Sequence, residues 1–144
     1  MCIQIINRLT DGPKKVIVLV ANHDLRDAAS YWIEDLGFAV DAAKNGAHAA
    51  NLLQEGAYQA LVTDRFVPPW PGLESIPKLK RRYPSMRLIV LLKRGPIGIG
   101  AMLRVAGADA VIEPPVRQAA LMTALLSTPA GRHIAHRNPN RRDV

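Results

Sequence analysis

The chain has 144 residues, of which 49% are hydrophobic and 22% are charged. This length and balance predict one folded domain with a substantial core and argue against wholesale disorder. No apolar run approaches the ~20 residues of a bilayer-spanning helix, and the single cysteine, Cys2, excludes a disulfide framework. The first residues lack the charged start and long apolar core of a signal peptide, so we expect a cytoplasmic protein.

The formal net charge is +7, and it is spread unevenly. Residues 14–127 carry 14 Lys or Arg and 10 Asp or Glu (+4), and residues 128–144 carry four arginines and one aspartate (+3). Such a surplus of positive charge favours binding to polyanions, but it does not imply recognition of a particular nucleotide sequence. We expect an N-terminal extension at 1–13, one domain at 14–127, and a basic, mostly disordered tail at 128–144.

Short apolar runs alternate with helical patterns along residues 14–127. Runs rich in β-branched residues predict strands at 15–21, 38–43, 58–64, 87–93 and 108–114. Apolar residues at helical spacing predict helices at 25–37, 46–57, 73–83, 101–107 and 117–126. Five strands alternating with five helices predict an α/β fold, in which helices cover both faces of a parallel sheet.

Single residues and short runs indicate where three of the helices begin or end. Asp24 is the expected N-cap of the first helix, and Gly37 is its expected C-terminal cap. Gly95, Gly98 and Gly100 predict that the helix after the fourth strand begins late or frays. The cations of the run Lys78–Arg82 sit where the third helix ends, and there they favour the helix dipole.

The run HDLR at residues 23–26 looks like the phosphoaccepting histidine box of sensor kinases. In that box the histidine lies in the middle of a long helix. Here an apolar strand runs directly into His23, and the helix begins only after it. We therefore interpret His23 as a turn residue and not as a phosphodonor.

Three segments, in order, resemble the response-regulator receiver domain: YQALVTDRFVPPWPGLE at 58–74, RLIVLLKRG at 87–95 and AGADAVIEPPV at 106–116. The resemblance covers residues 14–126. It implies a five-stranded parallel sheet in the order 2-1-3-4-5, with helices on both faces and the site at the carboxyl ends of the strands. It also implies that Asp64 is the phosphoacceptor position.

The other site positions depart from the family pattern. The family has an acidic pair after the first strand, a hydroxyl residue ending the fourth strand, an aromatic in the fifth strand and a lysine before its last proline. The matching residues here are Val20 with Ala21 or Ala21 with Asn22, then Leu92, Val111 and Pro114. Because Mg²⁺ prefers several anionic oxygens, we expect no metal site, no cofactor, and weak or absent Mg²⁺ binding.

These departures leave three hypotheses for function. The first is an atypical single-domain receiver, not an enzyme, that regulates by binding proteins while phosphorylation is impaired or absent. The second is a receiver that accepts phosphate at Asp64, although this carboxylate could instead be satisfied by loop amides or a basic neighbour. The least favoured is nucleic-acid binding through the basic tail, because no DNA- or RNA-binding signature accompanies it.

The expected partner is a protein, either a histidine kinase or another regulator. Trp70, on a proline-rich loop, is either a binding anchor or a cover for the unused pocket. Ile97 and Ile99 are further interaction candidates, in an apolar segment next to the fourth helix. A homodimer through the fourth helix, fifth strand and fifth helix is a second option, and neither a membrane nor nucleic acid is an expected partner.

Overall fold

The computed structural model of the protein describes residues 14–64, 75–92 and 98–126. The expected N-terminal extension and basic tail, as well as Trp70 and Ile97, lie outside the described residues. None of the helices within the described ranges is long and apolar enough to cross a membrane.

Within these ranges strands and helices alternate along the chain. In order they are β1 (Lys15–Leu19), α2 (His23–Asp35), β2 (Ala39–Ala42), α3 (Gly46–Glu55), β3 (Ala60–Asp64), α4 (Ser75–Arg82), β4 (Arg87–Leu91), α5 (Ile99–Ala106), β5 (Ala110–Ile112) and α6 (Gln118–Leu126). The strands form one sheet in the order β2-β1-β3-β4-β5, and every neighbouring pair is parallel. The predicted fold is confirmed.

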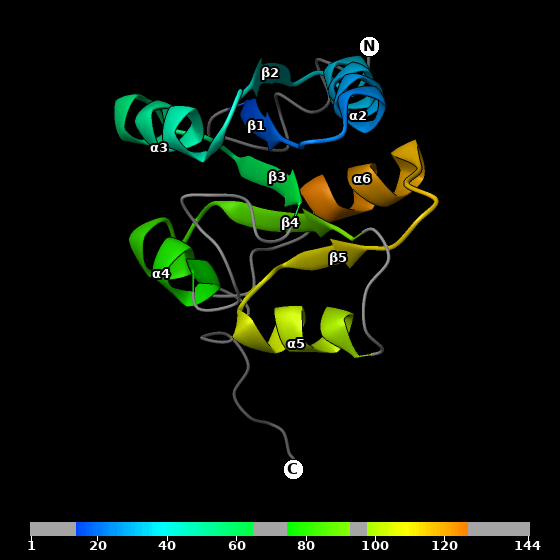
Figure 1. Ribbon diagram of the computed structural model, residues 1–144. Helices are drawn as coiled ribbons and strands as arrows, with labels where there is room; N and C mark the ends of the chain where they lie inside the picture. Colours follow the sequence, from blue (N-terminus) through cyan, green and yellow to red (C-terminus); the bar gives the residue numbers. More distant parts are fainter. Residues whose placement is uncertain (1–13, 65–74, 93–97, 127–144) are drawn as a thin grey trace.

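Helices cover both faces of the sheet (Figure 1). α2 and α6 pack on one face, and α3, α4 and α5 pack on the other. Along β4, Leu88 and Val90 point to the α3–α5 face while Ile89 and Leu91 point to the α2–α6 face. A strand buried on both faces needs apolar residues at every position, which is why the strand segments read as continuous apolar runs.

The first helix begins earlier than expected. α2 starts at His23, and its N-cap is Asn22, whose side-chain oxygen accepts a hydrogen bond from the Leu25 backbone N–H at 2.8 Å. The prediction that Asp24 is the N-cap is therefore wrong. Asp24 instead lies in the first turn of the helix, where its negative charge favours the helix dipole.

Glycines at the ends of α2 and α5 have positive φ, a conformation that glycine adopts without strain. Gly37 follows the C-cap of α2 with φ 104°, so that the Phe38 N–H reaches the Ile33 carbonyl at 3.4 Å. Gly98, with φ 89°, is the N-cap of α5. α5 thus begins at Ile99, two residues before the predicted segment, and includes Gly100 in its first turn.

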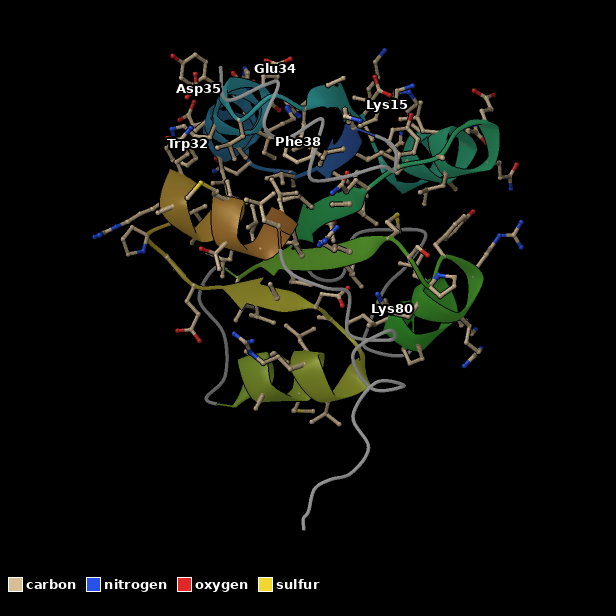
Figure 2. All side chains as sticks on the ribbon, turned by 180° about the vertical axis from the view of Figure 1, so that it is seen from behind. Lys15, Trp32, Glu34, Asp35, Phe38 and Lys80 are labelled. Carbon is tan, nitrogen blue, oxygen red and sulfur yellow. The ribbon has the colours of Figure 1, made fainter. Side chains whose placement is uncertain are left out.

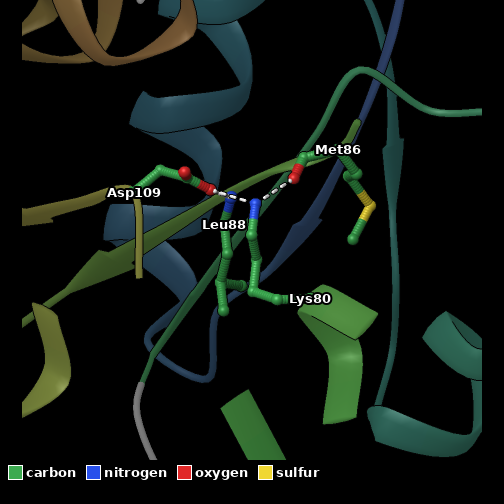
Figure 3. Close-up of polar contacts among 4 residues, drawn as sticks. All are labelled: Lys80, Met86, Leu88 and Asp109. Carbon is green, nitrogen blue, oxygen red and sulfur yellow. Dashed lines mark hydrogen bonds and ion pairs between the residues drawn. The ribbon is translucent and has the colours of Figure 1, made fainter. Parts of the chain in front are cut away.

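A buried ion pair joins α4 to the starts of β4 and β5 (Figure 3). The Lys80 ammonium lies 2.7 Å from the Asp109 carboxylate and also donates to the Met86 carbonyl at 2.9 Å. The same carboxylate oxygen accepts the Leu88 backbone N–H at 2.7 Å. The side chain of Lys80 is 11% exposed and that of Asp109 is 1% exposed. Both charges are therefore compensated where water scarcely reaches them.

Replacing Lys80 by Met should lower the free energy of unfolding by about 3–5 kcal/mol, because it leaves the Asp109 carboxylate buried without its counter-charge. Urea denaturation followed by circular dichroism measures this change. The matched control is Lys78→Met, an exposed position on the same helix, which should change stability by less than about 0.5 kcal/mol. Equal effects of the two substitutions would contradict the structural role of the pair.

Candidate functional site

The candidate site lies at the carboxyl ends of the central strands. β3 pairs with β1 through Thr63 and Leu19, and with β4 through Asp64 and Leu91. The backbone of Asp64 therefore ends the middle strand of the sheet, between β1 and β4, as the sequence predicted. The side chain of Asp64 lies outside the described part of the structure.

The residues after β1 offer little to a cation. Val20 is 2% exposed and packs into the core on the α2–α6 face. Ala21 carries no side-chain donor atom. The side-chain oxygen of Asn22 already accepts the Leu25 N–H as the cap of α2. This donor set does not fit Mg²⁺, which prefers several oxygen ligands, some of them anionic.

The search for a metal site can be widened to all of the described residues. Among the side chains that the structure describes, those of residues 14–63, 76–92 and 98–126, no three His, Cys, Asp or Glu side chains converge on a position that could hold a metal ion. The carboxylate nearest in sequence to the end of β1 is Asp24, which lies on the exposed first turn of α2. Of the residues that directly follow β1, only Asn22 offers a side-chain oxygen, and that neutral oxygen already caps α2.

Leu92 and Val111 are buried apolar residues that lie under the first turn of α5. Leu92 is 5% exposed and Val111 is 8% exposed, and both belong to the core on the α3–α5 face. A Cβ added at Gly100 would lie 3.7 Å from Leu92 Cδ1 and 3.7 Å from Val111 Cγ1. The backbone of α5 thus approaches both side chains closely at Gly100, and a side chain added at Gly100 would contact both of them.

The last strand ends in residues that face solvent. Glu113 and Pro114 are exposed, and the bond between Pro114 and Pro115 is cis. Pro114 has neither a charge nor a donor at this position. The carboxylate of Glu113 lies near the first turn of α5, 3.5 Å from the position that a Cβ of Gly100 would take.

The exposed apolar residues of α5 were not singled out from the sequence. Val105 is 88% exposed and Met102 is 53% exposed, whereas Ile99 is half-buried and packs against the core. Met102 and Val105 lie three residues apart, so they share one side of the helix. The spacing of Met102 and Val105 can be read from the sequence and indicates that they share one side of the helix. Because both sides of α5 are apolar, the sequence does not tell which side is buried.

Arg104 covers the outer edge of the sheet next to this helix face. Its guanidinium donates to the Val111 carbonyl at 3.1 Å. β5 is the last strand of the sheet, so a carbonyl that does not point toward β4 would otherwise face solvent. The one charged side chain of α5 is therefore directed to β5, and the outward face of the helix is apolar.

The chain matches the model of the response regulator receiver domain family over residues 16–126. The transcriptional regulatory protein TctD of Salmonella typhimurium is 30% identical over 120 residues, which cover 78% of this chain and 53% of that protein. The protein-glutamate methylesterase/protein-glutamine glutaminase 2 of Caulobacter vibrioides is 28% identical over 104 residues, which cover 69% of this chain and 30% of that protein. The chain thus spans about half or less of the length of these relatives.

Solved structures show the same fold. The receiver domain protein of Clostridium thermocellum superimposes with a TM-score of 0.68 at 20% identity, covering 77% of this chain and 90% of that one. Chemotaxis protein CheY4 of Vibrio cholerae gives 0.66 at 19% identity, covering 78% and 96%. A Burkholderia pseudomallei response regulator with a phosphorylated aspartic acid, calcium ion and citrate gives 0.68 at 22% identity, covering 85% and 71%.

The chain belongs to the response-regulator receiver family, whose members act in two-component signal transduction. The parallel sheet order and the position of Asp64 at the end of β3 agree with the resemblance found in the sequence. The assignment of Val20, Ala21, Asn22, Leu92, Val111 and Pro114 to altered site positions remains a prediction.

Replacing Gly100 by Ala should raise the free energy of unfolding by about 0.5–1 kcal/mol. The unfolded chain has fewer conformations with alanine than with glycine, so less backbone entropy is lost when α5 forms. The new Cβ would make ordinary van der Waals contacts with Leu92, Val111 and Glu113. Gly98→Ala is the control, and it should be destabilising because φ at Gly98 is +89°. Urea denaturation of both variants tests this. A loss of stability in Gly100→Ala would mean that α5 does not lie against Leu92 and Val111 as described.

Proposed function

We propose that this protein is an atypical receiver that regulates by binding another protein in the cytoplasm, with phosphorylation impaired or absent, and that it is not an enzyme. The observation that carries the proposal is that Leu92 and Val111 are both buried in the core beneath Gly100 of α5. In the family, a hydroxyl and an aromatic at these positions move together when phosphate arrives and shift the population of the output face. Two packed aliphatic side chains offer no hydrogen bond to a phosphoryl group and no ring to move.

The chemistry of phosphoryl transfer supports the same conclusion. Such transfer depends on positioning and on neutralising the charge that develops in the transition state. Here Val20 is buried among apolar side chains, the Asn22 oxygen caps α2, and Pro114 replaces the lysine that would bridge to the phosphoryl group. An acyl phosphate at Asp64 would therefore form slowly, and Mg²⁺ would bind in the millimolar range or more weakly.

The alternative is a receiver that is phosphorylated at Asp64 in spite of these changes. Two features favour it: Asp64 ends β3 in the middle of the sheet, and the Burkholderia pseudomallei relative carries a phosphorylated aspartic acid. Under this alternative, residues other than Leu92 and Val111 would transmit the signal from Asp64 to the output face.

The output face that we propose consists of α5, β5 and α6. Val105 and Met102 expose apolar surface on α5, and Met122 and Leu126 do so on α6, where they are 40% and 43% exposed. Exposed apolar surface of this kind marks contacts with other proteins. The partner is a histidine kinase or another regulator, or a second copy of the chain joined through the same face.

Phosphorylation can be tested with acetyl phosphate and Mg²⁺, read by intact mass. We expect no phosphoryl adduct on the natural chain. The variant Ala21→Asp/Leu92→Thr/Pro114→Lys restores a carboxylate, the hydroxyl and the ammonium, and it should gain an adduct that disappears when Asp64→Asn is added. Efficient modification of the natural chain, lost in Asp64→Asn, would establish the alternative.

The output face can be tested through self-association. If copies pair through α5, Val105→Asp should weaken dimerisation by about tenfold or more, because a carboxylate would enter an apolar contact. Analytical ultracentrifugation over a concentration series measures this. Tyr31→Asp is the control, since Tyr31 is 67% exposed but lies on α2. If the chain stays monomeric at all concentrations, the second-copy option is wrong and a protein partner remains.

A further inference from the structure

The two edges of the sheet differ in how their backbone groups are satisfied. β2 and β5 are the edge strands, and an edge strand presents N–H and C=O groups that no neighbouring strand can bond. On β5 the Val111 carbonyl accepts a hydrogen bond from the Arg104 guanidinium at 3.1 Å. Among the described residues, no side chain makes a comparable bond to the backbone of β2. Within this part of the chain, the edge at β2 is therefore open.

The free groups of β2 belong to Val40 and Ala42. The Ala39 N–H donates to the Lys14 carbonyl at 2.8 Å, so the backbone groups of Ala39 point toward β1. Successive residues of a strand alternate in the direction of these groups, so Asp41 also points toward β1, while Val40 and Ala42 point to the open edge. Their two N–H and two C=O groups have no hydrogen-bond partner among the described residues.

β2 lacks the side chains that usually protect an edge strand. It contains neither lysine nor proline. Its one charged residue is Asp41, whose carboxylate accepts the Tyr58 hydroxyl at 2.6 Å on the α3–α5 face. Val40, on the other face, is half-buried and packs against the same core as Phe38 (Figure 2). An added strand would thus meet apolar side chains on the α2 side of this edge.

The chain enters β1 next to the open edge, because Lys14 is the residue that bonds Ala39 at the start of β2. Residues 1–13 lie outside the described part of the structure, and their sequence predicts a strand followed by a turn. CIQII at 2–6 is rich in β-branched residues, and TDGP at 10–13 is a typical turn sequence. We refer to residues 2–6 as the N-terminal segment. A predicted strand is thus tethered beside a strand edge that lacks a partner.

The linker at 7–13 is long enough to bring the N-terminal segment to the open edge. Passing from β1 beneath β2 to its free side covers two strand spacings, about 10 Å, and a linker of this length spans up to about 20 Å. A chain that makes this turn runs antiparallel to β2. Pairing the apolar side of the segment with the apolar side of β2 places Ile3 and Ile5 on the α2 face and Gln4 on the opposite face.

We infer that the N-terminal segment forms a sixth strand, antiparallel to β2, with Ile5 opposite Val40 and Ile3 opposite Ala42. Residues paired in this way exchange both of their N–H···O=C bonds, so all four free groups of β2 are satisfied. The segment closes this edge to other chains, while the exposed apolar face of α5 remains available to a partner. Phosphorylation at Asp64 is not required for this contact.

A second copy of the chain is the weaker occupant of the edge. Antiparallel pairing of β2 with β2 satisfies the free groups with one another only if Val40 of each copy lies opposite Ala42 of the other. The two Asp41 side chains would then lie directly opposite each other, and like charges in that position are destabilising. In the N-terminal segment, the residue opposite Asp41 is the neutral Gln4.

Disulfide cross-linking tests this register. In a chain carrying Cys2→Ser, the substitutions Ile3→Cys and Ala42→Cys should together form an intramolecular disulfide under mild oxidation, because opposite residues of neighbouring strands have Cα atoms within about 6 Å. The matched control combines Ile3→Cys with Ala39→Cys in the same background. Ala39 and Ala42 are both exposed, but Ala39 lies about 10 Å further along β2. The control should form about fivefold less disulfide or lower still.

Intact mass and non-reducing electrophoresis measure these products. The inference is overturned if Ala42→Cys and Ala39→Cys cross-link equally, or if Ala39→Cys cross-links preferentially. It is also overturned if the disulfide joins two chains, which would place a second copy at the edge, or if no disulfide forms in a chain that circular dichroism shows to be folded.

Amide hydrogen exchange, followed by NMR, tests the same contact without cysteines. In the natural chain the N–H groups of Val40 and Ala42 should be protected, like that of Ala39, which is bonded within the sheet. Ile5→Pro removes the donor to the Val40 carbonyl and should speed exchange at Val40 and Ala42 by about tenfold or more. Gln4→Pro is the control, because the N–H of Gln4 would point away from β2, and it should leave both rates unchanged. Unprotected Val40 and Ala42 amides in the natural chain would show that no strand covers the edge.

Discussion

The structure depends on one constraint, the burial of both faces of a parallel sheet. β1, β3 and β4 lie in the interior of the sheet, and their side chains alternate between the two cores. Parallel strands need a crossover after each strand, and the helices of these crossovers supply the two outer layers. Most polar and charged side chains of the described residues consequently lie at strand ends or on the outer surfaces of helices.

The two ends of the sheet have different properties. At the carboxyl end, Val20, Leu92 and Val111 are buried and apolar, the Asn22 side chain caps α2, and the first turn of α5 lies over Leu92 and Val111. At the amino end, the Lys80 ammonium is buried against the Asp109 carboxylate, while Lys78, Arg81 and Arg82 on α4 are exposed.

The tight packing at the carboxyl end also limits conformational change. A close-packed interior passes between discrete arrangements and does not deform continuously, so a switch needs a second well-packed state. Leu92 and Val111 are buried beneath a glycine of α5, so movement of either side chain requires the residues around it to repack. Regulation through expression, or through competition for the α5 surface, is compatible with a single conformation.

Much of this protein could be predicted from its sequence, because strand and helix patterns are local. The continuous apolar runs of β1 and β4, the glycine after α2 and the three receiver-like segments were enough for the fold class, the strand order and the position of Asp64 at a strand end. The tertiary structure decided what depends on contacts between distant segments. Asn22 and Asp24 are both favourable N-cap residues, and the point at which β1 ends and α2 begins decides that Asn22 takes this position. Lys80 turns inward because Asp109, 29 residues away, lies beside it. Which apolar residues of α5 remain exposed follows from how the helix is rotated against the sheet, and the sequence of α5 alone does not contain that information.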